Sequence, residues 1–217
     1  MDDEPMLLRT YETRFASAEE LCRALTRRVR EALDGFVHVD RISFRPKAPA
    51  SFVTKALSTK PTGERRYDDP LRQIEDQVAG RVIVFFRDDL RPVTERLRSE
   101  LGPIEAIRRE PVGDAEFGYE SEHLIFVIPN HLKPTGWIND ETTPITFEMQ
   151  VRTLFMHAWA EPQHDLGYKP GVDVCVHREQ RRSLAWLAAS AWGADRILSE
   201  VARELGVTVD AGASGAS

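Results

Sequence analysis

The segment at residues 145–169, ITFEMQVRTLFMHAWAEPQHDLGYK, changes its periodicity partway along, and this change constrains the fold. Its first part alternates between apolar and polar residues, which are Ile145, Phe147, Met149 and Val151 against Thr146, Glu148, Gln150 and Arg152. A period of two predicts a β-strand with one buried face. A helical pattern follows from Leu154 to about Glu161 and places His157 and Glu161 on one helix face. The chain therefore joins a half-buried strand directly to a helix.

The free face of this strand carries a carboxylate, an amide and a guanidinium at two-residue spacing. Glu148, Gln150 and Arg152 lie about 7 Å apart along the strand. Such a row can hold a metal ion, a sugar or base edge, and a phosphate at once. The following helix adds His157, Glu161 and His164, but their spacing is not the His-Glu-x-x-His pattern of a zinc site. Local polar partners are the commoner explanation for such residues.

The composition is that of one globular domain with room for helical additions. The chain has 217 residues, of which 41% are hydrophobic and 29% charged. A net charge of −6 and a pI of about 5.6 argue against a general nucleic-acid binder. No apolar run approaches the roughly 20 residues of a membrane helix, and because the acidic N-terminus has no apolar h-region, we expect no signal peptide there. Cys22 and Cys175 stand far apart, which favours free thiols in a reducing cytoplasm.

Helical and strand patterns recur along the chain and predict an α/β or α+β domain. We expect an amphipathic helix at 17–33 with a capping box at Ser17 and Glu20, and a stop at Gly35. A second helix is capped by Asp88 or Asp89 and ends at Gly102. One long helix, or two, spans 178–205, with its inward residues expected to be Leu184, Leu187, Ala191, Leu198 and Val201. Strands are expected at 82–86 and 124–128, and a mobile loop at 55–67.

A basic segment before a predicted helix is a candidate polyphosphate site. Arg45 and Lys47 precede a helix that begins near Pro49 to Ser51, and Lys55 follows one turn later. Cations and a hydroxyl at a helix start suit phosphate groups, because free backbone N–H groups add to the charge. The alternative is a solvated basic face with an ordinary serine cap.

Two further segments carry candidate ligand-binding residues. Asp76 precedes the strand predicted at 82–86, and a carboxylate at such an edge often binds Mg²⁺; alternatively it pairs with Arg81. Tyr119 follows a glycine and enters another strand, where its ring can stack on a base or pack at the rim of the core.

Together and in this order, the motifs resemble the synthetase domain of the RelA/SpoT family, which makes the alarmones guanosine tetra- and pentaphosphate. The resemblance covers about Arg41 to Lys169. The matching residues are Arg45-Pro-Lys47 with Ser51 and Lys55, Asp76 with Arg81, Gly118-Tyr119 with Ser121 and His123, Glu148-x-Gln150-x-Arg152-Thr153, and the run from Met156 to Lys169. Since neither a hydrolase domain before Arg41 nor a regulatory domain after Lys169 is expected, the chain looks like a small, stand-alone synthetase.

The resemblance implies a nucleotidyltransferase-like fold, with a mixed β-sheet flanked by helices and a helical C-terminal layer. It implies transfer of the β,γ-pyrophosphate of ATP to the 3′-hydroxyl of GDP or GTP, with Mg²⁺ as cofactor. Asp76 and Glu148 would be the catalytic residues and metal ligands. ATP would be bound by Arg45, Lys47, Ser51, Lys55 and Arg81, and the acceptor by Tyr119, Ser121, His123, Gln150 and Arg152.

The same resemblance divides the chain and leaves some partners open. We expect an N-terminal helical segment, a synthetase core, C-terminal helices and a disordered tail, at residues 1–40, 41–170, 171–207 and 208–217. A homo-oligomer is expected, with a monomer or an antitoxin-bound form as alternatives. Two rival functions remain, namely a toxic synthetase that modifies the 3′ end of tRNA and a non-catalytic nucleotide-binding regulator.

Departures from the family pattern concern the acceptor side and one glycine. Asp114, Glu116 and Glu120 stand beside Tyr119, where the family often has basic or amide residues. An acidic rim repels acceptor phosphates, so we expect GDP to be preferred over GTP. Gly80 is shifted one place toward Arg81.

Overall fold

The computed structural model describes residues 3–109, 121–140, 143–167 and 177–207. Its strands are β1 (Val39–Pro46), β2 (Val78–Val84), β3 (Glu105–Arg109), β4 (Ser121–Val127) and β5 (Thr146–Thr153). Its helices are α1 (Asp3–Ala32), α2 (Pro49–Ala56), α3 (Pro70–Gln73), α4 (Arg87–Leu101), α5 (Leu154–Gly167) and α6 (Arg178–Glu204), with the 3-10 turns η1 (Glu75–Gln77) and η2 (Asn130–Leu132).

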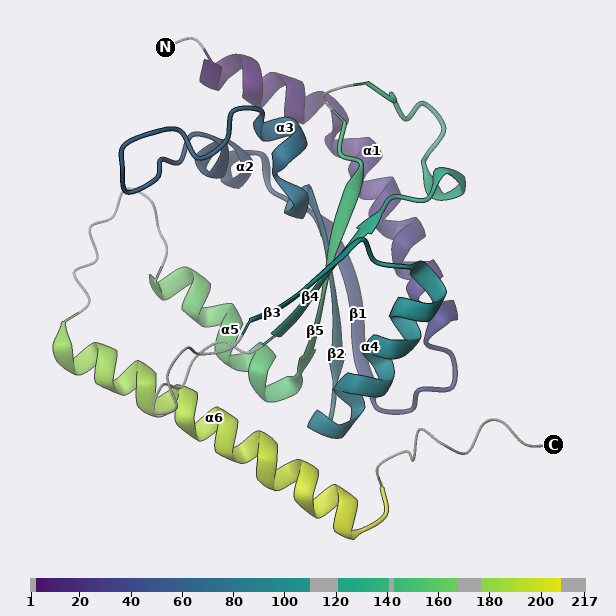
Figure 1. Ribbon diagram of the computed structural model, residues 1–217, viewed down its shortest axis with the longest axis vertical. Coiled ribbons are helices and arrows are strands. Elements are labelled where there is room, and N and C mark those ends of the chain that lie inside the picture. The colour runs from purple at the N-terminus through teal and green to yellow at the C-terminus, as the bar shows by residue number, and fades with distance from the viewer. Residues whose placement is uncertain (1–2, 110–120, 141–142, 168–176, 208–217) are drawn as a thin grey trace.

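The strands form one mixed sheet in the order β1-β2-β5-β4-β3. β2 and β5 run parallel in its middle, and the other neighbouring pairs are antiparallel. In Figure 1 the sheet is seen nearly edge-on, with α1 and α4 on one side and α5 on the other, where α6 packs against α5. The expected fold class, a mixed sheet flanked by helices with a helical C-terminal layer, is confirmed.

The main core lies between the sheet and the two helices α1 and α4. It buries side chains such as Leu25 of α1, Leu97 of α4 and Met149 of β5. Phe126 and Phe147 stack on neighbouring strands with ring centroids 5.0 Å apart. Burial of this kind, at about 25 cal/mol per Å² of apolar surface, drives the sheet and helices together.

Close packing explains why a glycine stands at position 80 of β2. Gly80 pairs with Phe44 across β1 and β2. A Cβ atom at Gly80 would lie 2.3 Å from the Phe44 ring, which is closer than any real contact. The ring also packs edge-on against Phe147 of β5, with centroids 5.8 Å apart. Glycine at this position therefore lets an aromatic side chain of β1 close over β2.

The structure corrects several expectations about the helices. The first helix begins at Asp3, so Ser17 lies in its interior and is no cap, although Gly35 (φ 87°) does stand at the stop. The helix that ends at Gly102 has Phe86 as its N-cap, and the Asp89 carboxylate accepts a hydrogen bond from the Phe86 amide.

The inward face of α6 was also predicted wrongly. Leu187, Leu198 and Val201 are exposed, whereas the buried residues are Ala188, Asp195, Ser199 and Ala202. This face of α6 is turned inward because its polar side chains hydrogen-bond to the rest of the protein. Asp195 accepts a hydrogen bond from Thr153 at the end of β5 (2.9 Å). The Ser199 hydroxyl in turn accepts one from the Arg87 amide (2.8 Å).

Two remaining predictions concern the strand of the opening segment and the loop at 55–67. Phe147, Met149 and Val151 are buried as expected, but Ile145 is exposed, because β5 begins one residue later. Part of the loop is ordered by a β-bridge between Thr59 and Arg65.

In the described part of the chain, no helix is both long and apolar enough to cross a membrane. Cys22 is a free, buried cysteine. Burial, reinforced by Glu19, raises the pKa of its thiol to about 12, so it stays protonated. Cys175 lies outside the described residues.

Candidate active site

Two rows of residues cross the sheet on the face away from α1 and α4. One row contains Arg45, Ala79 and Glu148 on β1, β2 and β5, and continues to Ile125 of β4. The next runs over four strands and contains Ser43, Arg81, Gln150 and His123. Paired residues of neighbouring strands point to the same face of a sheet. The register of β1, β2, β5 and β4 thus brings together residues that are far apart in the sequence.

These rows line a cleft of about 260 Å³. Its walls include most of the residues that the sequence assigned to the donor and the metal, namely Arg45, Lys47, Ser51, Asp76, Arg81 and Glu148. Gln150 and Arg152, which the sequence assigned to the acceptor, line it too. Ser43 and Ala79 line it as well. The cleft combines guanidinium, ammonium and carboxylate groups, which suits a polyphosphate bound with a divalent cation.

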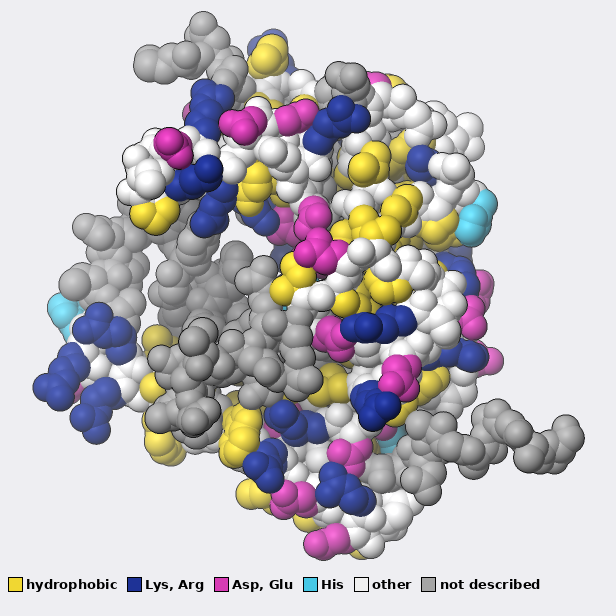
Figure 2. All heavy atoms as spheres, in the orientation of Figure 1, with side chains coloured by type: hydrophobic (Ala, Val, Ile, Leu, Met, Phe, Trp, Pro, Cys, Tyr) yellow, Lys and Arg dark blue, Asp and Glu magenta, His cyan; other side chains and the backbone are white. Residues whose placement is uncertain are grey.

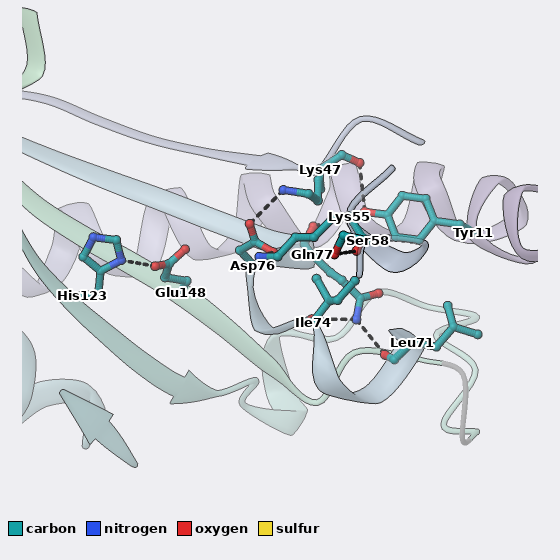
Figure 3. Close-up of polar contacts among 10 residues, drawn as sticks. All are labelled: Tyr11, Lys47, Lys55, Ser58, Leu71, Ile74, Asp76, Gln77, His123 and Glu148. Carbon is teal, nitrogen blue, oxygen red and sulfur yellow. Dashed lines mark hydrogen bonds and ion pairs between the residues drawn. The ribbon is translucent and has the colours of Figure 1, made fainter. Parts of the chain in front are cut away.

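Asp76 is held between two lysines at one end of the cleft (Figure 3). Its carboxylate oxygens lie 2.8 Å from Nζ of Lys47 and 2.9 Å from Nζ of Lys55. Burial raises the pKa of Asp76, but the two ammonium groups outweigh burial and hold this pKa below its ordinary value. The alternative interpretation, in which Asp76 pairs with Arg81, is therefore wrong, and the carboxylate is ionised at neutral pH.

Glu148 is paired with His123 from the neighbouring strand β4. Nδ1 of His123 is hydrogen-bonded to Oε1 of Glu148, and Figure 3 shows the ring directed at this carboxylate. Burial raises the pKa of Glu148 and the Asp76 carboxylate acts in the same direction, but the hydrogen bond and charge of His123 outweigh them. The pKa of Glu148 is therefore held below its ordinary value. A cation between the two carboxylates would relieve their repulsion.

A glutamate on α5 holds an arginine of the cleft. Oε1 of Glu161 lies 2.8 Å from Nη1 of Arg81 and 3.9 Å from Nη1 of Arg152. Arg152 is buried and is also hydrogen-bonded to Gln150. The helix that follows β5 thus fixes the guanidinium of Arg81 over the sheet, a link that local sequence patterns did not reveal.

The basic segment adopts the geometry expected of a helix start. α2 begins at Pro49, and its N-cap is Ala48, which makes no side-chain cap. Ser51 is exposed in the first turn and lines the cleft, so it is not the ordinary cap of the alternative interpretation. Arg45 is exposed on β1 and also lines the cleft. Arg45 and Lys47 directly precede this helix start, and the free N–H groups of a first turn add to the attraction for an anion.

The acceptor residues are described only in part. Tyr119 and its acidic neighbours Asp114, Glu116 and Glu120 lie outside the described residues. Ser121 and His123 are buried on β4, two residues apart and so on one strand face. The hydroxyl oxygen of Ser121 has no hydrogen-bond partner within the described part of the chain.

The chemistry of the two carboxylates in the cleft can be compared with what a divalent cation requires. Among the residues that the structure describes, no group of three or more His, Cys, Asp or Glu side chains is placed to hold a metal ion. The side chain of His164 is not described. Mg²⁺, however, takes one or two protein carboxylates and completes its shell with water and substrate phosphates. Asp76 and Glu148, both ionised and both lining the cleft, fit that requirement.

A cleft on one face of a mixed sheet that combines ionised carboxylates with several cations suits a polyphosphate bound with a divalent cation. A family model described as a region found in RelA / SpoT proteins matches residues 44–173. The curated GTP pyrophosphokinase YjbM of Bacillus subtilis (strain 168) is 30% identical over 171 residues, which make up 77% of this chain and 74% of that protein. The chain belongs to the RelA/SpoT family.

Solved structures share the whole fold. The crystal structure of small alarmone synthetase 1 from Bacillus subtilis has a TM-score of 0.66 at 22% identity, and the match covers 95% of this chain and 100% of that one. The same synthetase bound to its product pppGpp also has a TM-score of 0.66, at 20% identity, covering 91% and 99% of the two chains. A GTP pyrophosphokinase family protein from Streptococcus pneumoniae gives 0.63 at 22% identity, covering 94% and 95%.

Proposed function

We propose that the protein is a pyrophosphokinase that transfers the β,γ-pyrophosphate of ATP to the 3′-hydroxyl of GDP or GTP, forming the alarmones (p)ppGpp. The observation that carries this proposal is the cleft itself, in which Asp76 and Glu148 share the lining with Arg45, Lys47 and Arg81. Membership of the RelA/SpoT family and the GTP pyrophosphokinase activity named for the Bacillus subtilis relative support it.

On the donor side, the basic side chains would bind the ATP phosphates and the carboxylates would bind Mg²⁺. Lys47 and Lys55 are already within the same cluster as Asp76, so they would exchange this carboxylate for phosphate oxygens as Mg²⁺–ATP enters. Arg45, Ser51 and Arg81 would complete the donor contacts. Bound Mg²⁺ would neutralise charge on the phosphates, which is the main requirement of phosphoryl transfer.

In the reaction, the 3′-oxygen of the acceptor forms a bond to the β-phosphorus of ATP. The bond between this phosphorus and the oxygen that bridges to the α-phosphorus breaks, and AMP leaves with the electron pair. We assign the hydroxyl proton to Glu148, whose carboxylate is ionised and hydrogen-bonded to His123. Tyr119, Ser121, His123, Gln150 and Arg152 would bind the acceptor, with stacking on the guanine by Tyr119.

A labelling experiment tests this function. The protein is incubated with Mg²⁺ and γ-labelled ATP together with GDP, GTP, ATP or bulk tRNA, and labelled products are separated. We expect label in a guanosine tetra- or pentaphosphate together with release of AMP. Label in tRNA alone would replace the nucleotide acceptor with the tRNA 3′ end. Nucleotide binding without any transfer would instead support the third function, a non-catalytic nucleotide-binding regulator.

We also propose that the protein acts in the cytoplasm and self-associates. Within the described residues α6 exposes a series of apolar side chains, namely Trp186, Leu187, Ile197, Leu198 and Val201, and Leu205 is exposed directly after the helix. Figure 2 shows hydrophobic side chains along this helix. Apolar surface of this extent favours an interface. Light scattering coupled to size exclusion distinguishes an oligomer from a monomer, and an antitoxin-bound form would appear as a co-purified second chain.

A further inference from the structure

Tyr11 connects the N-terminal helix to the donor side of the cleft. It lies on α1, outside the residues that match the family model, and its side chain is only 7% exposed. Sequence patterns assigned this part of the chain only a helical role. The structure places its side chain against three segments that carry proposed donor-site residues (Figure 3).

The hydroxyl of Tyr11 joins the end of β1 to η1. Its single proton is shared in a bifurcated hydrogen bond, mainly with the backbone carbonyl of Lys47 (2.9 Å) and more weakly with that of Gln77 (3.4 Å). The Lys47 amide donates to the same Gln77 carbonyl (2.8 Å). Gln77 directly follows Asp76, so these bonds fix the two backbone segments whose side chains form the Lys47–Asp76 ion pair.

The ring of Tyr11 contacts the third segment. It stacks on Phe52 of α2, with ring centroids 4.1 Å apart and planes within 8° of parallel. Phe52 is fully buried and lies between Ser51 and Lys55, two proposed donor contacts. A small second core formed around Tyr11, Phe52 and Ile74 holds this arrangement together.

The protonation state of the hydroxyl suits this role. Burial raises the pKa of Tyr11 above its ordinary value, and the Asp76 carboxylate raises it further. The hydroxyl therefore keeps its proton and acts as a donor toward backbone carbonyls throughout the physiological range.

We propose that Tyr11 is a positioning residue for the donor nucleotide, which sets the relative placement of Lys47, Asp76 and α2 without touching the substrate. This inference rests on the proposed function, because it takes ATP as the ligand of the cleft. It adds a residue from outside the family-matched region to the binding of the pyrophosphate donor.

The test uses Tyr11→Phe, which keeps the stacking ring and removes only the hydroxyl. Binding of Mg²⁺–ATP is measured by titration calorimetry without acceptor, and KM and kcat are measured with each substrate varied. We expect weaker ATP binding and a higher ATP KM, by between about threefold and about tenfold, since one hydrogen bond contributes a modest net free energy. The acceptor KM should stay within a factor of about two, because the acceptor contacts lie on other strands.

Tyr67→Phe is the matched control. Tyr67 packs against the same small core, and its hydroxyl makes no hydrogen bond within the described part of the chain. It should bind ATP as the wild type does. Tyr11→Leu removes both ring and hydroxyl and should weaken ATP binding more than Tyr11→Phe, so that phenylalanine partly restores binding by stacking alone.

The outcomes separate this role from the proposed function. Unchanged ATP binding and ATP KM in Tyr11→Phe would overturn the positioning role, as would an equal rise in both KM values together with a lowered melting temperature. If the wild type binds ATP but labels no acceptor, the proposed function fails, while weaker ATP binding by Tyr11→Phe still supports the positioning role.

Discussion

The ammonium nitrogen of Lys47 lies 2.8 Å from a carboxylate oxygen of Asp76, although the two residues are 29 positions apart in the sequence. Lys55 contacts the other oxygen of the same carboxylate at 2.9 Å. In the proposed reaction these three groups exchange partners, because the lysines move to ATP phosphates and the carboxylate to Mg²⁺. The cluster is therefore the natural place to begin testing the donor site.

Lys47→Ala should weaken ATP binding by about one to two orders of magnitude, because it removes a charge-assisted phosphate contact. Titration calorimetry with Mg²⁺–ATP measures the effect. Lys60→Ala, which removes an exposed lysine paired only loosely with Glu64 (3.9 Å), should leave ATP affinity unchanged. Equal affinity in wild type and Lys47→Ala would return the segment from Arg45 to Lys55 to a solvated basic face.

Glu148→Gln should abolish transfer while ATP binding survives. The amide keeps the shape of the side chain but loses the charge needed to bind Mg²⁺ or accept the hydroxyl proton. Single-turnover labelling and ATP titration on the same preparation measure the two effects. Glu122→Gln, a change one residue before His123 on β4 at a side chain paired with Arg98, should transfer normally. Rapid transfer by Glu148→Gln would remove both roles from this carboxylate.

Asp76 should make stability depend on pH in the acidic range. Its pKa is below the ordinary value of 3.8 in the folded protein, since the two lysines outweigh the opposing effect of burial. Its contribution is therefore fully present above about pH 4 and is lost as the pH falls through the folded pKa. Melting temperatures between pH 2 and pH 7 should fall more steeply for the wild type than for Asp76→Asn. Parallel curves would show that the ion pairs do not stabilise the fold.

The helix α6 should depend on a single buried carboxylate. Asp195 is 1% exposed and accepts a hydrogen bond from Thr153 (2.9 Å). Asp195→Ala should lower the free energy of unfolding by about 1–3 kcal/mol, because it leaves buried polar groups without this partner. Urea denaturation measures the change, with Glu200→Ala on the exposed side of α6 as the control. A loss in the control as large as in Asp195→Ala would contradict this anchoring.

The alternation along β5 predicted which of its residues share a face, because a strand places side chains on opposite faces with a period of two. The face expected to be free is only partly so, since Thr146 and Arg152 are buried. Contacts between segments that are distant in the sequence could not be predicted in this way. The pairing of Asp76 with Lys47 and Lys55 depends on how β1 and β2 align, and the Arg81–Glu161 pair depends on where α5 lies over the sheet. No local period encodes either relationship.

The face of α6 shows a different limit of sequence patterns. Apolar periodicity pointed Leu187, Leu198 and Val201 inward, yet the helix buries small and polar residues instead. Asp195 finds its partner in Thr153, which is 42 positions away. A buried acid is favourable only when such a partner exists, and a single helical sequence does not reveal it. Tyr11 was missed for the same reason, since its partners are two backbone carbonyls at distant positions.

The acceptor preference follows from the charges near Tyr119. Asp114, Glu116 and Glu120 stand close to Tyr119 in the sequence and lie outside the described residues. Each additional 5′-phosphate on the acceptor brings more repulsion from this acidic stretch. We therefore expect a higher kcat/KM with GDP than with GTP, and a smaller difference at high ionic strength, where exposed charges are screened. Initial rates with both acceptors at two salt concentrations measure this preference.

A charge reversal beside Tyr119 tests directly whether the charges there select the acceptor. Glu120→Lys replaces a repulsive charge with an attractive one and should shift the preference toward GTP, whose extra phosphate gains most from the change. Glu64→Lys, a reversal at an exposed position of the loop after α2, has the same effect on net charge and should leave the preference as it is. The electrostatic explanation fails if the wild type uses GTP as fast as GDP, or if both reversals shift the preference equally. In the second case overall charge, rather than the residues beside Tyr119, would select the acceptor.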